Sequence, residues 1–191
     1  TLARALARRL GAAVVNSDVV RKGLAGASDR RNNVAYGKGI YNPSMTGRAY
    51  RRMTEEVERH LAVGEGVIVD ATFQKAAQRS AVFEAAARNG APLAIVYCHT
   101  RDGVVRERLF RRAEGGRDIS DGTWRIYLKQ REVFEPFAES APYHALNTGA
   151  PVGELCGEVE QFLRAAFSTR EKPTLSYPVQ QPAAHLLSAS R

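Results

Sequence analysis

The stretch Val67-Ile-Val-Asp-Ala-Thr72 is a short run of mostly β-branched residues with a carboxylate near its end. A continuous apolar run of this length is typical of a strand buried in a parallel sheet. Gly64 and Gly66 precede the run, and a helical pattern follows it over residues 74–88. Open α/β sheets bind ligands at the carboxyl ends of their strands. We therefore expect Asp70 to lie at a ligand-binding edge.

Strands and helices alternate on both sides of this stretch. The pattern predicts strands over residues 12–18, 67–72, 93–98 and 144–147, and helices over residues 2–10, 19–24, 44–63, 75–88, 102–113, 123–137 and 152–167. Such alternation indicates an α/β domain with a parallel sheet and helices on both faces. We expect Ser44 to cap the helix that follows it. Residues 26–43 form a long polar loop of a kind that is usually functional or disordered.

The domain organisation follows from the same pattern. Residues 1–167 carry all the predicted strands and helices, so we expect them to form one domain. Residues 168–191 contain three prolines and no hydrophobic period. We expect this segment to be a disordered tail.

The composition narrows the choice of partner and compartment. The net charge is +8, and arginine supplies most of the basic residues. Since the guanidinium fork suits phosphate, we expect a phosphorylated partner; a GC-rich genome that encodes basic residues as arginine is the open alternative. The apolar runs are too short for a membrane span. Cys98 and Cys156 have no metal-binding spacing and are expected to be buried free thiols, as in a reducing cytoplasm.

Two predicted strands each end in an aspartate, and both carboxylates are candidate catalytic or metal-binding groups. Asp18 and Asp70 are expected at the same edge of the sheet. One could accept a proton from an attacking hydroxyl, and the other could hold a hydrated Mg²⁺. The alternative is that each residue caps a helix. Arg21 follows Asp18 by one helical turn, where it could bind a substrate phosphate or form a salt bridge with Asp18.

A basic helix and a glycine-rich break after it suggest a lid. Arg108 and Arg112 are four residues apart and share a face of the predicted helix. The break at residues 114–122 contains Arg117. This arrangement suits a lid that neutralises charge on a transferring phosphoryl group. A solvated basic face is the alternative, because Arg106 and Arg111 lie on the same helix.

Five segments in register carry a family resemblance. The chain resembles bacterial AAA-type kinases related to polynucleotide kinase and zeta toxin, over about residues 1–165, and its first residues look like those that follow Gly-Lys-Ser in a Walker A motif. In many bacteria such a domain is fused behind an aminoglycoside-phosphotransferase-like domain. The matching segments are Asn16-Ser-Asp-Val-Val-Arg-Lys-Gly-Leu24, Tyr36-Gly-Lys-Gly-Ile-Tyr41, Val67-Ile-Val-Asp-Ala-Thr-Phe73, Gln78-Arg79 and Ser120-Asp121.

The resemblance implies a role for each matching residue. ATP and Mg²⁺ are the implied cofactors, and a small molecule or nucleotide is the implied acceptor. Asp18 matches the general base, Arg21 the arginine that binds substrate phosphate, and Asp70 the strand-end residue that organises Mg²⁺. The remaining matches are lid arginines (Arg108, Arg112), residues near the nucleotide (Thr1, Arg117, Asn147, Thr148) and an acceptor-side arginine (Arg79).

The chain departs from these kinases at the Walker A motif. No Gly-x-x-x-x-Gly-Lys-Ser/Thr occurs in the 191 residues, and the first residue is threonine. In the nucleoside-monophosphate-kinase-like P-loop fold that the resemblance implies, the strand before this motif is central in the sheet. We therefore expect a gap between the strand that bears Asp70 and the strand at 93–98, and we interpret the chain as an inactive fragment of a longer protein.

Three functions are compatible with the sequence. The leading hypothesis is a cytoplasmic kinase domain that transfers the γ-phosphate of ATP to a hydroxyl. The second is an ATP-binding module that regulates a fused upstream domain without phosphoryl transfer. The third is a nucleic-acid-binding module, which the sequence disfavours because its arginines are scattered and lack interleaved aromatic residues.

Overall fold

Helices and strands alternate along the chain in the computed structural model, which describes residues 1–26, 37, 39–115 and 123–168. Each helix and strand predicted from the sequence is confirmed within this range, and a short 3₁₀ helix lies inside the predicted loop. Arg117 and all of the predicted tail except Ser168 lie outside the described residues. In order, the elements are α1 (Leu2–Leu10), β1 (Ala13–Asn16), α2 (Ser17–Leu24), η1 (Gly39–Tyr41), α3 (Pro43–Ala62), β2 (Val67–Asp70), α4 (Ala76–Arg88), β3 (Ile95–His99), α5 (Asp102–Gly115), α6 (Trp124–Glu132), β4 (Tyr143–Asn147) and α7 (Val152–Ser168).

The strands form two parallel pairs. β1 pairs with β2 from Ala13↔Val67 to Asn16↔Asp70. β3 pairs with β4 from Ile95↔Tyr143 to His99↔Asn147. Among the described strands no ladder joins β2 to β3, which is the place where the sequence predicted an interruption.

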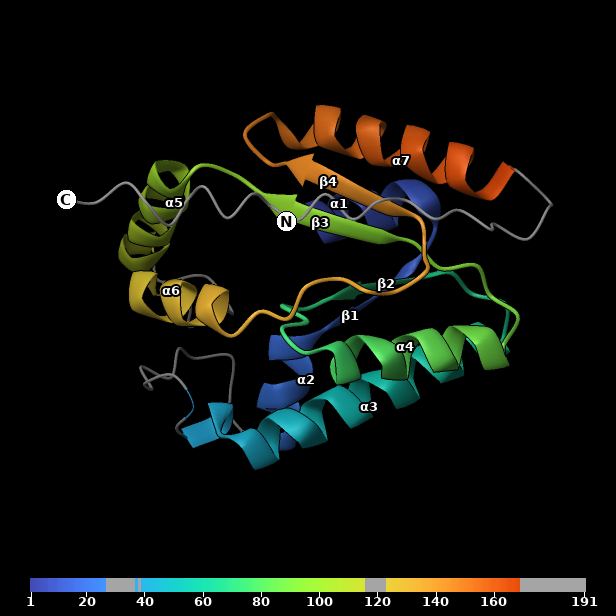
Figure 1. The fold of residues 1–191 in the computed structure, drawn as a ribbon, viewed down its shortest axis with the longest axis horizontal. Helices are drawn as coiled ribbons and strands as arrows, with labels where there is room; N and C mark the ends of the chain where they lie inside the picture. The colour runs from blue at the N-terminus through green and yellow to red at the C-terminus, as the bar shows by residue number, and fades with distance from the viewer. Residues whose placement is uncertain (27–36, 38, 116–122, 169–191) are drawn as a thin grey trace.

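Helices cover both faces of the strands (Figure 1). On one face, α2, α3 and α4 pack against Val15, Val67 and Val69, around the fully buried Met53. On the other face, α1 and α7 form a second core around Leu146 and Val159. Ile68 of β2 and Val96 of β3 both contact this second core. Since each strand pair contributes to it, this second core joins the two pairs.

The facing edges of β2 and β3 are incompletely covered. Every residue of β2 is half-buried, and Cys98 and His99 at the end of β3 are exposed. The prediction that Cys98 is buried is therefore wrong, because no described strand pairs with this edge of β3. Cys156 is buried as predicted, and both cysteines are free thiols. Desolvation, and secondly the Asp70 carboxylate, raise the pKa of the Cys98 thiol.

Three predicted boundaries are wrong for local reasons. β1 ends at Asn16, so Asp18 lies in the first turn of α2 and not in a strand. Asn42, not Ser44, caps α3, because Pro43 fits the first helical position and the Asn42 side chain accepts from the Met45 amide at 2.8 Å. α6 ends at Glu132 and not near residue 137. No helix of the described residues is long and apolar enough to span a bilayer.

Candidate active site

Asn16 organises the carboxyl edge of β1 and β2. Its side-chain oxygen accepts from the amides of Asp18 (3.0 Å) and Val19 (3.1 Å), which caps α2. Its side-chain nitrogen donates to Asp70 at 3.0 Å. One residue therefore fixes the start of the Asp18 helix and the orientation of the Asp70 carboxylate. Sequence reasoning missed Asn16, although asparagine before a helix start is a preferred cap.

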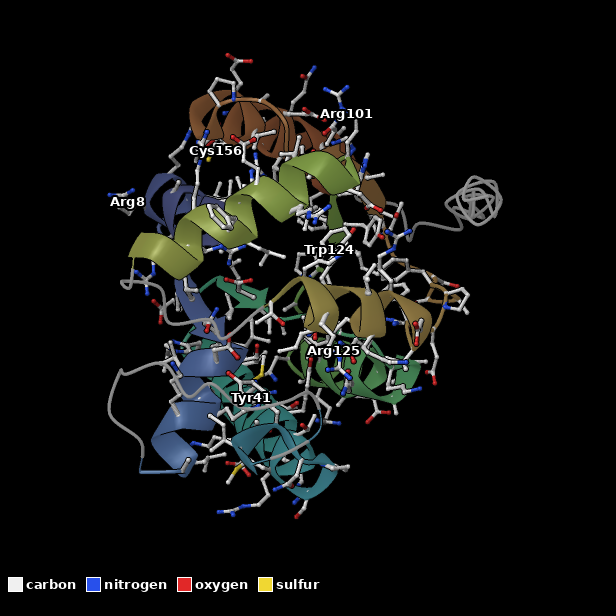
Figure 2. All side chains as sticks on the ribbon, turned by 90° about the vertical axis from the view of Figure 1, so that its left-hand side faces the viewer. Arg8, Tyr41, Arg101, Trp124, Arg125 and Cys156 are labelled. Atoms are coloured by element: carbon white, nitrogen blue, oxygen red, sulfur yellow. The ribbon has the colours of Figure 1, made fainter. Side chains whose placement is uncertain are left out.

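Asp18 and Arg21 form an ion pair on α2. An Arg21 terminal nitrogen lies 2.8 Å from an Asp18 carboxylate oxygen, and only 9% of the Arg21 side chain is exposed. The guanidinium lies over the Tyr41 ring, 4.7 Å from its centroid, and Figure 2 shows Tyr41 beside α2. The salt bridge is thus confirmed. Within the described part of the chain, the buried Arg21 Nε has no hydrogen-bond partner. Phosphate binding by Arg21 stays a prediction.

The Asp70 carboxylate is the predicted magnesium ligand at this edge. Asp70 supplies one carboxylate, and the residues that the structure describes contain no cluster of three or more His, Cys, Asp or Glu able to hold a metal. Mg²⁺ keeps several waters and is usually bound by one or two carboxylates together with substrate phosphates. Asp70 therefore suits Mg²⁺ that arrives with a nucleotide.

A predicted lid arginine, Arg108, and a predicted nucleotide-site residue, Thr148, meet between α5 and the loop after β4. The Arg108 guanidinium donates to the Thr148 carbonyl at 2.6 Å and to its hydroxyl at 3.1 Å. Thr148 in turn donates its amide to the His99 carbonyl at 2.8 Å. Asn147 accepts from the Gly149 amide at 3.1 Å, which shapes the same loop. The structure thus brings Arg108, Thr148 and Asn147 together at the carboxyl ends of β3 and β4, while Arg112 lies exposed farther along α5.

Arg79 occupies a buried position on α4. Its side chain is 3% exposed and bonds to the Glu139 carboxylate and to the carbonyls of Phe73 and Pro136, both at 2.9 Å. Because all three nitrogens are engaged within the protein, the geometry favours a structural role over the predicted contact with substrate. Its partners lie as far as 60 residues away, and no local sequence signal reveals them.

Thr1 occupies the N-cap position before α1 and is exposed. It lines an open hollow of about 800 Å³ along α1, together with Arg4, Arg8 and Glu65. Its side chain makes no capping bond. Its predicted role beside the nucleotide stays a prediction. Arg117, Ser120 and Asp121 fall outside the described residues.

A family model described as "AAA domain" matches residues 1–137. The chain belongs to this family. No curated protein sequence matches it. The match covers α1 to α6, and so includes Asp18, Asp70 and Arg108.

Solved kinase structures share the fold of this AAA domain. A gluconokinase from Sinorhizobium meliloti 1021 aligns with a TM-score of 0.59 and 19% identity, over 86% of this chain and 85% of that one. The APS kinase CysC from Mycobacterium tuberculosis, solved with AMPPNP and APS, gives 0.55 and 20%, over 85% and 88%. A sugar kinase from Janibacter sp. HTCC2649 gives 0.57 and 13%, over 86% and 87%. The α/β P-loop kinase fold predicted from the sequence is confirmed.

Proposed function

We propose that this AAA domain transfers the γ-phosphate of ATP to a hydroxyl of a small molecule or nucleotide. The observation that carries the proposal is the Asn16 bridge, which holds the Asp70 carboxylate beside the first turn of the Asp18 helix. An acceptor hydroxyl needs a base, and a nucleotide needs a metal-binding carboxylate, at the same edge of the sheet.

The two carboxylates take different roles. Asp18 accepts the proton of the acceptor hydroxyl, while the ion pair with Arg21 fixes its orientation. Asp70 would hold Mg²⁺, and the bound ion would neutralise phosphate charge. Arg108 carries a further positive charge on α5, on the side of the domain where the strands end (Figure 1). Catalysis then rests on positioning and charge neutralisation.

A kinase of this kind also needs a phosphate-binding loop. The 191 residues contain no Walker A sequence. We place the Walker A strand between β2 and β3, because both strands are parallel to their partners and no described strand pairs with their facing edges. We infer that this strand belongs to a longer polypeptide, in which an aminoglycoside-phosphotransferase-like domain could stand upstream.

We propose the chemical class of the acceptor and not a single compound. The structural neighbours include a gluconokinase, a sugar kinase and an APS kinase. Sugars and nucleotides are therefore the first acceptors to test. We place the reaction in the cytoplasm, where a reducing environment preserves the two free thiols.

The test is phosphoryl transfer by a chain that carries the strand and Walker A segment of the gluconokinase in front of Thr1. Asp18→Asn lowers kcat by about a hundredfold or more, because the base is lost, and leaves the Kd for ATP unchanged. Glu58→Gln is the control, since Glu58 pairs with Arg88 on the surface. Unchanged turnover in Asp18→Asn would remove Asp18 as the base. ATP binding without transfer to any acceptor would favour a regulatory ATP-binding module.

A further inference from the structure

A hydrogen-bonded seam joins residues 73–79 to residues 134–139. The Glu135 amide donates to the Gln74 carbonyl at 2.8 Å. The Glu135 carboxylate accepts from the Ala76 amide at 2.7 Å and from the Lys75 ammonium at 3.0 Å. Two segments about 60 residues apart are thus joined through main chain and side chain.

Arg79 is the centre of this seam. Its guanidinium bonds to Phe73 on one side of the seam and to Pro136 and Glu139 on the other. It lies 5.6 Å from the Phe134 ring centroid and 4.8 Å from that of Phe137. The side chains of Arg79 and Glu139 are 3% and 10% exposed. A buried and fully hydrogen-bonded pair of this kind leaves a costly unpaired charge when one partner is removed.

The seam holds a strained turn next to the Asp70 edge. Phe73 follows Asp70 by three residues and is the one described non-glycine residue with a positive φ, 43°. Its amide donates to the buried Tyr50 hydroxyl at 3.1 Å, and its carbonyl accepts from Arg79 at 2.9 Å. Strained backbone of this kind persists only where its surroundings fix it. Here α3 and α4 fix the same residue from two sides.

The other end of the seam leads into α6. Phe134 comes two residues after the last residue of α6, the helix that carries Trp124 and Arg125 in Figure 2. Arg131 of α6 bonds to both carboxylate oxygens of Asp102 at 2.9 and 2.7 Å. Asp102 begins α5, which carries Arg108. A continuous set of contacts therefore runs from the turn after Asp70 to α6, and from α6 to α5, the helix that carries Arg108.

We propose that Arg79 is a positioning residue that couples the 71–75 turn to α6, so that an acceptor bound at the turn also orders α5 and α6. Arg79 touches no substrate in this proposal and acts through Phe73. The identity of the ligand rests on the proposed function, whereas the coupling itself does not.

Amide hydrogen exchange on the 191-residue chain tests the coupling directly. Arg79→Lys keeps the charge and removes the fork that reaches three partners, so exchange rises about tenfold at residues 71–76 and also in α6 at residues 124–132. Exchange in α1 and α7 stays unchanged. Arg88→Lys is the matched control, because Arg88 lies on the same helix and pairs with Glu58 at the surface; it changes neither segment.

An increase confined to residues 71–79 and 134–139, with α6 unchanged, would overturn the coupling. If Arg79→Lys raises exchange throughout the chain, Glu139→Gln replaces it as the milder variant, and the same comparison decides. In the chain extended with a Walker A segment, Arg79→Lys raises the acceptor KM about fivefold and the ATP KM less than twofold. Equal changes in both constants contradict a positioning role. Absence of transfer by the extended wild-type chain rejects the proposed function and leaves the exchange result valid.

Discussion

Asn16 shows how one short side chain positions two carboxylates. Asn16→Ala removes the cap of α2 and the bond to Asp70. We expect a loss of about 1–2 kcal/mol in the free energy of unfolding, measured by urea denaturation.

Asn16→Asp separates the two contributions of this residue. Aspartate caps a helix as well as asparagine does, but it places a second carboxylate beside Asp70. We therefore expect the cap to be retained and the free energy of unfolding at pH 7 to fall by about 1 kcal/mol, measured by urea denaturation, because the bond to Asp70 is lost and two like charges face each other. An Asn16→Asp chain as stable as the wild type would show that the Asn16 contact with Asp70 does not form.

Single residues were predicted unevenly from the sequence. Asp70 could be assigned to a strand end because a β-branched run leads directly to it. Asp18 was assigned to a strand end as well, but the Asn16 cap starts α2 before it. The family resemblance placed Arg79 on the acceptor side. Its structural role was not predicted, because its partners Pro136 and Glu139 are distant in sequence. Local patterns report periodicity and caps, whereas contacts between distant segments arise only from packing.

At the scale of elements, Glu135 joins the start of α4 to the segment after α6. The Ala76 amide, and secondly the Lys75 ammonium, hold the pKa of Glu135 below its usual range. A lowered carboxyl pKa contributes stability above the unfolded value, and this stability is lost as the pH falls through the folded value. The difference in stability between wild type and Glu135→Gln is thus constant above about pH 4.5 and shrinks below it. Urea midpoints between about pH 3 and pH 6 measure it; a constant difference throughout would show that Glu135 is not held by these donors.

The contact between α5 and α6 depends on one carboxylate. Asp102 accepts from Arg131 and from the Tyr127 hydroxyl at 3.0 Å. Asp102→Asn weakens these bonds, so we expect the fluorescence anisotropy of Trp124, the single tryptophan, to fall while global stability changes by less than about 1 kcal/mol. Glu132→Gln, which removes the exposed pair with Lys129, leaves the anisotropy unchanged. Equal effects of the two variants would contradict a specific tie between the helices.

The extent of α6 shows the limit of reading elements from periodicity. An apolar pattern continues through Phe137 and predicted a longer helix. The chain leaves the helix after Glu132, since Glu135 donates its amide to Gln74 and Pro136 accepts from Arg79. Pro136 is also a local signal against a longer helix, because it has no amide hydrogen and its ring clashes with the carbonyl four residues earlier, that of Glu132.

At the scale of the whole molecule, the two strand pairs are the feature that most limits function. Alternation along the sequence predicted the layers, and the family resemblance predicted the interruption between β2 and β3. The exposure of Cys98 at this edge was not predicted, because an apolar run reports burial only when its neighbouring strand is present.

The uncovered edges lead to a prediction about nucleotide affinity. Without backbone amides to surround the phosphates, the 191-residue chain binds Mg·ATP with a Kd above about 1 mM, measured by titration calorimetry. The chain extended with a strand and Walker A segment binds at least about a hundredfold more tightly. Tight Mg²⁺-dependent binding by the 191-residue chain alone would show that the phosphates bind elsewhere.

The most direct test of the kinase assignment is the transfer of radiolabel from [γ-³²P]ATP to a panel of sugars and nucleotides by the extended chain. We expect label to enter one class of acceptor, and we expect Asp18→Asn to abolish this transfer while ATP is still bound. Release of label only as inorganic phosphate with every acceptor, or equal transfer by Asp18→Asn, would contradict it.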